Sequence, residues 1–156
     1  MINLVNAIGN PFELHPQLRT IWPEPYATAA AEASATDSDT GDVWLIVKDQ
    51  EVVGITGIFL DSDGSPEEIF LRWHGIVQRE RGNGTAKAAL RLAVERIRDV
   101  FPERKRLVEL APDNEYGWTL VIPHFFSLGF VRDGDPTDHK DAVVRSLRLV
   151  FNLENV

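Results

Sequence analysis

Two glycines one residue apart, Gly82 and Gly84, are the feature of this sequence that most directly suggests chemistry. Glycine in or beside a helix costs roughly 1 kcal/mol, so a pair there indicates an unusual backbone conformation or a close approach. The pair follows the apolar stretch EIFLRWHGI and precedes a run of helical periodicity from about Gly84 to Val100. Because free N–H groups at the start of a helix attract anions, the spacing predicts a main-chain cradle for a phosphate group.

Two well-known phosphate-binding loops have a different spacing. A Walker loop needs Gly-Lys-Ser/Thr after four intervening residues, and a Rossmann fingerprint needs three glycines and an acidic residue at the end of the next strand. Neither pattern is present here. The stretch has the form Arg-x-x-Gly-x-Gly, in the residues Arg79-Glu80-Arg81-Gly82-Asn83-Gly84.

This hexapeptide and its surroundings resemble the pyrophosphate-binding signature of the GNAT family of acetyl-CoA-dependent N-acetyltransferases. A hairpin and a strand precede it, a long helix follows, and the later stretch IPHFFSLGF is similar to the family's second signature, which ends in Gly-Phe. The resemblance covers about residues 43 to 134. It implies a GNAT fold of the α/β (α+β) class, with a central, mostly antiparallel mixed sheet of about six to seven strands. Helices flank that sheet, which is splayed at a bulge in the fourth strand.

The resemblance also implies which residues contact acetyl-CoA as co-substrate. The strand before the cradle is expected to bulge and to leave backbone groups that pair with the pantetheine arm like an added strand. The implied contacts are Trp73, His74 and Ile76 on that strand, Arg79, Glu80, Arg81, Gly82, Asn83, Gly84 and Thr85 in the cradle, and Asn114 and Phe125 beyond it. His74 stands where the family usually has an aliphatic residue, which favours a structural imidazole over a catalytic one. An ordinary turn residue is the alternative for Asn114.

Acetyl transfer to an amine requires a proton acceptor. An alkyl ammonium has a pKa of about 10, so a base or a water relay must remove a proton before the nitrogen can attack. Glu68, six residues before His74, lies where several family members carry such a base, and it is our candidate. An equally good interpretation is that Glu68 is a solvated side chain at the end of a strand. Glu109 on the following strand and a catalytic His74 are the next candidates.

Phe125 is the plainest departure from the family. The family's usual proton donor to the leaving thiolate is a tyrosine four residues before the glycine of Gly-Phe, and Phe125 occupies that position. His124, Ser127, Tyr116 or water could supply the proton instead, and His124 is our candidate. Because a thiol with a pKa of about 8.5 leaves readily, losing the acid should slow the reaction rather than prevent it.

Several elements must position these residues. One or two short helices are expected within residues 14 to 36, and a hairpin in VWLIVKDQEVVGITGIFL that turns at Asp49-Gln50-Glu51. Beyond the cradle, RLVELAP predicts a strand, YGWTLVIPHFFSLG a helix, GFVRDG a strand and AVVRSLRLVFNL a long final strand. No linker divides the chain, so one domain over residues 1–156 is predicted.

The composition limits the class of protein. With 156 residues, 44% of them hydrophobic and 26% charged, the chain can bury a sizeable core. The absence of cysteine excludes a disulfide framework, sulfur-ligated zinc and a covalent acyl-cysteine, and it favours a cytoplasmic setting. No metal is expected. Neither a signal peptide nor a membrane span is apparent, and the net charge of −8 disfavours a broad nucleic-acid surface.

Two functions fit these expectations best. The first is an N-acetyltransferase that moves an acetyl group from acetyl-CoA to a primary amine of a small molecule or peptide, by direct attack in a ternary complex. The second, which Phe125 allows, is a catalytically weak GNAT-like domain that binds acyl-CoA as a sensor or partner-binding module. An acetyltransferase that modifies a host target or nucleic acid is a third. Residues 14–42 and 133–140 match no motif and are expected to shape the amine site. The final strand could also pair across a homodimer.

Overall fold

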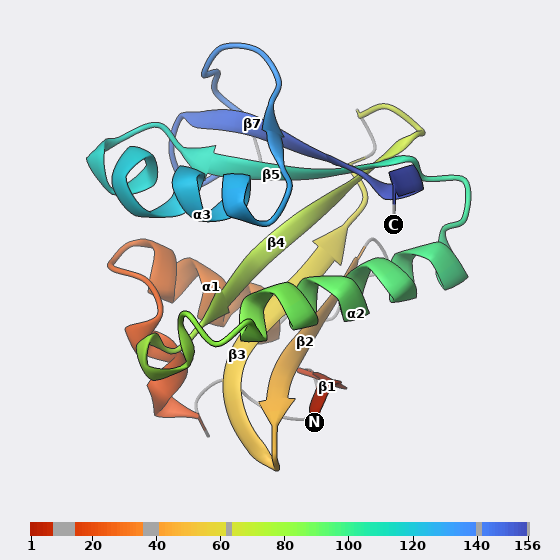
Figure 1. Cartoon of the computed structure of the whole chain (residues 1–156). Coiled ribbons are helices and arrows are strands. Elements are labelled where there is room, and N and C mark those ends of the chain that lie inside the picture. The colour runs from red at the N-terminus through yellow and green to blue at the C-terminus, as the bar shows by residue number, and fades with distance from the viewer. Residues whose placement is uncertain (8–14, 36–40, 62–63, 140–141, 156) are drawn as a thin grey trace.

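The computed structural model describes residues 1–7, 15–35, 41–61, 64–139 and 142–155 (Figure 1). Within this part of the chain, seven strands form one mixed sheet in the order β1-β2-β3-β4-β5-β7-β6. The strands are β1 (Ile2–Asn6), β2 (Gly41–Lys48), β3 (Glu51–Phe59), β4 (Glu68–Ile76), β5 (Arg106–Pro112), β6 (Val131–Arg132) and β7 (Ser146–Asn152). All neighbouring pairs are antiparallel except β4 and β5. The predicted mixed, mostly antiparallel sheet is therefore confirmed.

Helices cover both faces of this sheet. The predicted helix after the glycines is α2 (Thr85–Val100), and its buried residues recur at helical spacing: Thr85, Ala86, Ala89, Leu90, Ala93, Val94 and Ile97. This face packs against β1, β3 and β4, while α1 (Tyr26–Ala35) contacts β2 and lies behind the sheet in Figure 1. The 3-10 helix η2 (Pro16–Thr20) and α1 are the short helices expected between residues 14 and 36. Among the described residues, no helix is long and apolar enough to cross a membrane.

The region after β5 differs in detail from the expected single helix. A π-helical turn, η4 (Gly117–Val121), leads into α3 (Ile122–Ser127), with Pro123 in the first turn of α3. Proline has no N–H and its ring crowds the preceding turn, so a regular α-helix cannot run through it without adjustment. The irregularity therefore has its cause in Pro123.

Three strands differ from expectation. The edge strand β1 was not predicted, because Leu4 is its only buried residue and its apolar pattern is correspondingly weak. β6 has only two residues, and β7 begins at Ser146 rather than near Ala142. β7 pairs along its length with β5 and at Leu149 and Val150 with β6, so much of its hydrogen-bonding capacity is used within the chain. Pairing across a homodimer stays a prediction.

The sheet splays at an irregularity in β4. Arg72 pairs with Gly57 and Gly75 with Ile55, so Trp73 and His74 together face the single residue Thr56, which is a β-bulge. The parallel pairing of β4 with β5 covers only Glu68–Phe70 and Arg106–Val108, and beyond it the two strands diverge (Figure 1). The predicted splay at a bulge in the fourth strand is confirmed.

Candidate active site

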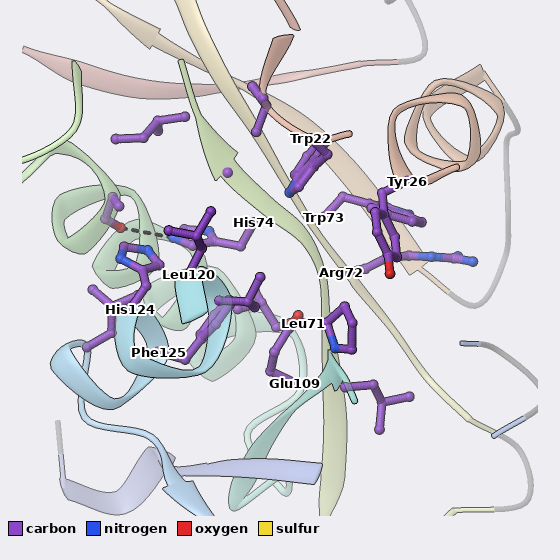
Figure 2. A pocket seen from close by; sticks show the side chains of 18 of the residues that line it. Trp22, Tyr26, Leu71, Arg72, Trp73, His74, Glu109, Leu120, His124 and Phe125 are labelled. Carbon is purple, nitrogen blue, oxygen red and sulfur yellow. Dashed lines mark hydrogen bonds between the residues drawn. The ribbon is translucent and has the colours of Figure 1, made fainter. Parts of the chain in front are cut away.

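A cavity of about 850 Å³ lies where β4 and β5 separate (Figure 2). Its size is typical of small-molecule sites. The segment from Thr20 to Tyr26, the start of α2, the η4–α3 segment and residues 142–146 contribute the other walls. In Figure 2, His74, His124 and Phe125 gather on the side of α2 and α3, Trp22, Tyr26, Arg72 and Trp73 on the side of α1, and Glu109 between them. The cavity therefore has two chemically different ends, one lined by the two histidines and Phe125 and the other by the tryptophans, Tyr26 and Arg72.

The glycine turn forms the cradle that its spacing predicts. Gly82 and Gly84 have φ of +84° and +78°, the left-handed region that side chains rarely adopt. A Cβ atom at either position would meet nothing within 4 Å, so these glycines leave open space above the backbone. Gly84 is the N-cap of α2 and makes no side-chain capping hydrogen bond, and the first-turn N–H groups have no intrahelical partners. This arrangement fits a pyrophosphate.

Ion pairs fix the cradle from outside the cavity. Glu80 accepts hydrogen bonds from Lys48 Nζ at 2.8 Å and from Thr85 Oγ1 at 3.4 Å. The hydrogen bond from Lys48 lowers the pKa of Glu80, so the carboxylate stays ionised. Arg79 pairs with Glu51 and with Glu80. Arg79 and Glu80 do not line the cavity, and their ion pairs hold the turn. Their contacts with acetyl-CoA stay a prediction.

Cationic side chains border the cradle on its cavity side. Arg81 lines the cavity and donates a hydrogen bond to the backbone oxygen of Ile21 at 3.2 Å, which ties the turn to the segment before α1. Lys87 lines the cavity from the first turn of α2. Asn83 is exposed and does not line the cavity. The charged groups suited to phosphate are therefore Arg81 and Lys87.

His74 is a buried connection between three elements. Its Nε2 lies 3.0 Å from the Ala86 oxygen in α2, and its Nδ1 lies 2.8 Å from Thr56 Oγ1 in β3. A carbonyl oxygen can only accept, so Nε2 carries the proton and Nδ1 accepts from the Thr56 hydroxyl. Burial lowers the pKa of His74 to about 4, although the hydrogen bond to Ala86 opposes this shift. The imidazole is neutral and both nitrogens are engaged, which favours the structural role.

Among the residues that the structure describes, Glu109 is the carboxyl group that lines the cavity. It lies on β5 directly after Val108, the last residue paired with β4. Its Oε2 atom is buried and has no hydrogen-bond partner among the described residues. Burial raises the pKa of Glu109 well above its ordinary value. A carboxylate with a raised pKa is a stronger base, so Glu109 has the properties that removal of a proton from an ammonium requires.

Glu68 lies elsewhere. It is the first residue of β4, about 20 Å along the strand from His74 at roughly 3.3 Å per residue, and it does not line the cavity. Its Oε2 accepts hydrogen bonds from Arg106 Nε at 3.3 Å and from Arg148. A carboxylate that is absent from the cavity lining and is held by two guanidinium groups is typical of a structural ion pair, which argues against Glu68 as the base. The identity of the base stays a prediction.

Phe125 is buried at the position where the family resemblance implies a phenol. Its ring centroid lies 5.6 Å from that of His124 and 6.3 Å from that of His74. His124, Tyr116 and Ser127 all line the same cavity. Partial burial, with the nearby charge of Arg81, lowers the pKa of His124, so this imidazole is neutral at neutral pH. Burial raises the pKa of Tyr116, which keeps its phenol protonated.

Asn114 does not line the cavity. Its Nδ2 donates to the Tyr26 hydroxyl at 2.8 Å, and its Oδ1 accepts from the Gly117 N–H at 2.8 Å. The side chain therefore caps η4 and holds Tyr26, whose ring stacks on Tyr116 at 5.4 Å. These bonds favour the alternative of an ordinary turn residue, and the contact of Asn114 with the co-substrate stays a prediction.

An aromatic wall was not identified from the sequence. Trp22 packs edge-on against Trp73 at 5.7 Å, and Trp73 has φ of +54° at the bulge. The Trp73 Nε1 atom is buried and has no partner among the residues described. Trp22 and Tyr26 belong to the segment WPEPY, whose concentration of aromatic residues and prolines outside a periodic pattern was the available signal. Within the described ranges, no cluster of three or more His, Asp or Glu side chains could hold a metal ion.

Comparisons with known proteins agree with this fold. The model of the acetyltransferase (GNAT) family matches residues 12–120. A GNAT-family protein from Desulfovibrio desulfuricans superposes with a TM-score of 0.75 at 11% identity, covering 98% of this chain and 99% of that one. Aminoglycoside acetyltransferase AAC(6')-Ib in complex with coenzyme A gives 0.70 at 15% identity, covering 97% and 94%.

A spermidine N-acetyltransferase SpeG chimera of Vibrio cholerae and hSSAT gives a TM-score of 0.66 at 11% identity, covering 99% of this chain and 96% of that one. At such identities, the likeness shows the fold. None of the curated protein sequences compared with the chain matches it.

Proposed function

Because the chain belongs to the acetyltransferase (GNAT) family, we propose that it moves an acetyl group from acetyl-CoA to a primary amine of a small molecule or peptide by direct attack in a ternary complex. One observation carries the proposal: a single cavity joins the Gly82–Gly84 cradle to the unpartnered carboxyl of Glu109. The absence of cysteine, which excludes an acyl-cysteine, supports direct attack and a cytoplasmic location.

The cradle residues would hold the pyrophosphate of acetyl-CoA. The backbone N–H groups from Gly82 to Thr85 supply donors, the dipole of α2 favours negative charge, and Arg81 and Lys87 add positive charge. The part of β4 that has parted from β5, near Trp73 to Ile76, offers main-chain groups to the pantetheine arm. His74 contributes by positioning, since it ties this strand to the first turn of α2.

Glu109 would prepare the amine. Its carboxylate accepts a proton from the ammonium group, directly or through a water molecule, and leaves a neutral nitrogen at the point where β4 and β5 part. The nitrogen then bonds to the acetyl carbon, the carbon–sulfur bond breaks and sulfur leaves as a thiolate. The proton that the nitrogen loses on becoming an amide balances the charge of the thiolate, and Glu109 returns its own proton to solvent.

With phenylalanine at position 125, no phenol is present there to protonate the leaving thiolate. His124, which lines the cavity beside Phe125, is the candidate that passes a proton to sulfur, and its lowered pKa means that it does so as a neutral N–H donor or together with water. Phe125 also favours a second function, a domain that binds acyl-CoA as a sensor or partner-binding module and transfers weakly. Release of coenzyme A separates the two functions.

Calorimetry tests the cradle. Gly84→Val should lose acetyl-CoA binding, because a side chain would fill the space above the N–H groups. Gly134→Val is the matched control: Gly134 also has a positive φ, +87°, and open space at its Cβ, but it does not line the cavity. The control should bind acetyl-CoA normally. Unchanged affinity in Gly84→Val, with the fold intact by circular dichroism, would contradict the assignment.

Steady-state release of coenzyme A with a panel of amines then tests the activity. We expect turnover that depends on an amine and on the cradle, and therefore disappears in Gly84→Val but not in Gly134→Val. Tight acetyl-CoA binding without amine-dependent release by the wild type would favour the sensor function instead.

A further inference from the structure

We infer that the amine acceptor is a small molecule that carries one anionic group on an aromatic or apolar body, rather than a polycation. The inference rests on the proposed acetyl transfer and names its substrate class. Its basis is the α1 side of the cavity, formed by Trp22, Tyr26, Arg72 and Trp73 (Figure 2).

The charges lining the cavity do not suit a polycation. Among the described lining residues Glu109 is the only carboxyl, whereas Arg72, Arg81 and Lys87 are cationic. A ligand with several ammonium groups needs several carboxylates to replace the water that it loses on binding. The chain has 24 acidic residues, but apart from Glu109 none of them lines this site in the described structure. One carboxyl suffices for one reacting amine.

Arg72 adds a positive charge away from the cradle. Its guanidinium carbon lies 4.9 Å from the centroid of the Phe59 ring, which itself packs against Phe70 at 5.0 Å. Stacking on an aromatic ring orients a guanidinium group, and an oriented guanidinium recognises a carboxylate through its planar fork of donors. Arg72 precedes Trp73 on β4, and it lines the same cavity as Glu109 on β5. Amine and anion of one molecule can therefore be held by opposite charges.

Trp73 points to the same chemistry. Tryptophan is bulky, and a φ of +54° is uncommon for it, so the surrounding structure maintains this conformation against its preference. The buried Nε1 is a donor only, and it has no acceptor among the described residues. An oxygen atom of the bound molecule would satisfy this donor, and a carboxylate is an acceptor that an ammonium cannot replace.

The aromatic rings around these polar groups indicate the chemistry of the rest of the acceptor molecule. Trp22 and Trp73 form an edge-to-face pair, and Tyr26 and Tyr116 form a stacked pair. Such walls bury apolar or aromatic surface. Aromatic rings also attract cations, and a preference for cations is the competing outcome that the experiment must separate.

The experiment compares aromatic amino acids with their decarboxylated amines. The probes are phenylalanine with phenethylamine and tryptophan with tryptamine, and spermidine and kanamycin represent polycations. With acetyl-CoA saturating, kcat/KM for coenzyme A release should be at least about 10-fold higher for each amino acid than for its decarboxylated partner, because a charged hydrogen bond contributes about that factor. The polycations should be the poorest acceptors.

Two variants test whether Arg72 and Trp73 cause the preference for amino acids over their decarboxylated amines. Arg72→Gln should lower kcat/KM for phenylalanine about 10-fold and leave phenethylamine unchanged. Trp73→Phe keeps a ring but removes the N–H, and it should lower the ratio of kcat/KM for tryptophan to kcat/KM for tryptamine. Arg132→Gln is the matched control, because Arg132 also lies over an aromatic ring, Trp118 at 5.6 Å, but outside the cavity.

The outcomes separate this inference from the proposed function. Better turnover of the decarboxylated amines or of the polycations would overturn the inference and leave the acetyltransferase intact. If no amine is acetylated, calorimetry of the same amines on the protein saturated with coenzyme A decides. Arg72-dependent binding of the amino acids alone would support the substrate class despite the failed activity, and absence of binding would overturn both.

Discussion

At the start of β4 the strand is paired with β5 and the carboxylate of Glu68 is held by Arg106 and Arg148, whereas further along the two strands part and Glu109 faces a cavity. Both glutamates are shielded from bulk water. Their partners differ, because guanidinium groups neutralise Glu68 and no described residue bonds to Oε2 of Glu109. Shielding alone therefore does not identify a reactive carboxyl group. A carboxyl oxygen without a fixed partner beside a cavity is the better candidate, and the predictions below test it.

The largest expected effect is on turnover. Glu109→Gln should lower kcat by about 1,000-fold, because general base catalysis contributes roughly 100-fold to 10,000-fold. Glu68→Gln, the matched change in the paired part of β4, should retain turnover within a few fold. Coenzyme A release measured on both variants checks the contrast. Equal losses, or a loss confined to Glu68→Gln, would reverse the assignment.

The pH profile sharpens the same assignment. Because burial raises the pKa of Glu109, kcat should rise with pH through an acidic limb whose midpoint lies well above 4.5. The limb should disappear in Glu109→Gln and persist in Glu68→Gln. A limb that survives in Glu109→Gln would belong to another group.

The next effect concerns His74, at the open end of β4. Its pKa is about 4 in the folded protein and ordinarily 6.5, so the unfolded chain binds a proton first as the pH falls. His74 therefore lowers the free energy of unfolding by up to about 3 kcal/mol between pH 6.5 and pH 4.

Urea unfolding of wild type and His74→Gln at pH 7 and pH 4.5 measures the contribution of His74 to the free energy of unfolding. The other groups titrate in both proteins, so their contributions cancel in the comparison. The wild type should lose about 2 to 3 kcal/mol more than the variant over this interval. Parallel losses would mean that the imidazole is not buried as a neutral group.

A smaller effect tests the closed end of β4. Glu68→Gln should lower the free energy of unfolding by about 2 kcal/mol, because it leaves Arg106 and Arg148 without their shared carboxylate. Their side chains are 39% and 30% exposed, so solvent reduces the loss below that of a fully buried pair. Glu67→Gln, which removes a 45% exposed partner of the same Arg106, should cost less than about 1 kcal/mol. Equal losses in chemical denaturation would count against a structural Glu68.

The smallest effect is at Phe125. Phe125→Tyr places a phenol where the family resemblance implies one and keeps nearly the same volume. The rate of coenzyme A release should rise by no more than about 10-fold or stay unchanged, because a good leaving group gains little from an acid. A large fall in rate would show that this position does not face the leaving sulfur.

The sequence predicted those features that depend on local pattern. The glycine spacing gave the turn at Gly82 and Gly84, helical periodicity gave α2, and the family resemblance placed the bulge near Trp73. Contacts between distant segments could not be read in this way. The arginine that Glu68 meets, Arg148, is 80 residues away on β7, and no local pattern predicts this contact.

The same limit applies to smaller features. The position of Asn114 after β5 did not predict that its side chain bonds to Tyr26, 88 residues away. The edge strand β1 buries one residue, which is too weak a pattern to detect. Residues 36–40 and 140, part of the segments expected to shape the amine site, lie outside the described residues.

The ties around the glycine turn have a consequence for binding. Lys48 holds Glu80 from β2, Glu51 holds Arg79 from β3, and Ile21 anchors Arg81 from the segment before α1. A turn restrained from three directions has already lost its conformational entropy when the protein folds, so a ligand need not order it on arrival. More of the interaction energy with a pyrophosphate then appears as affinity, and little rearrangement of the backbone should accompany binding.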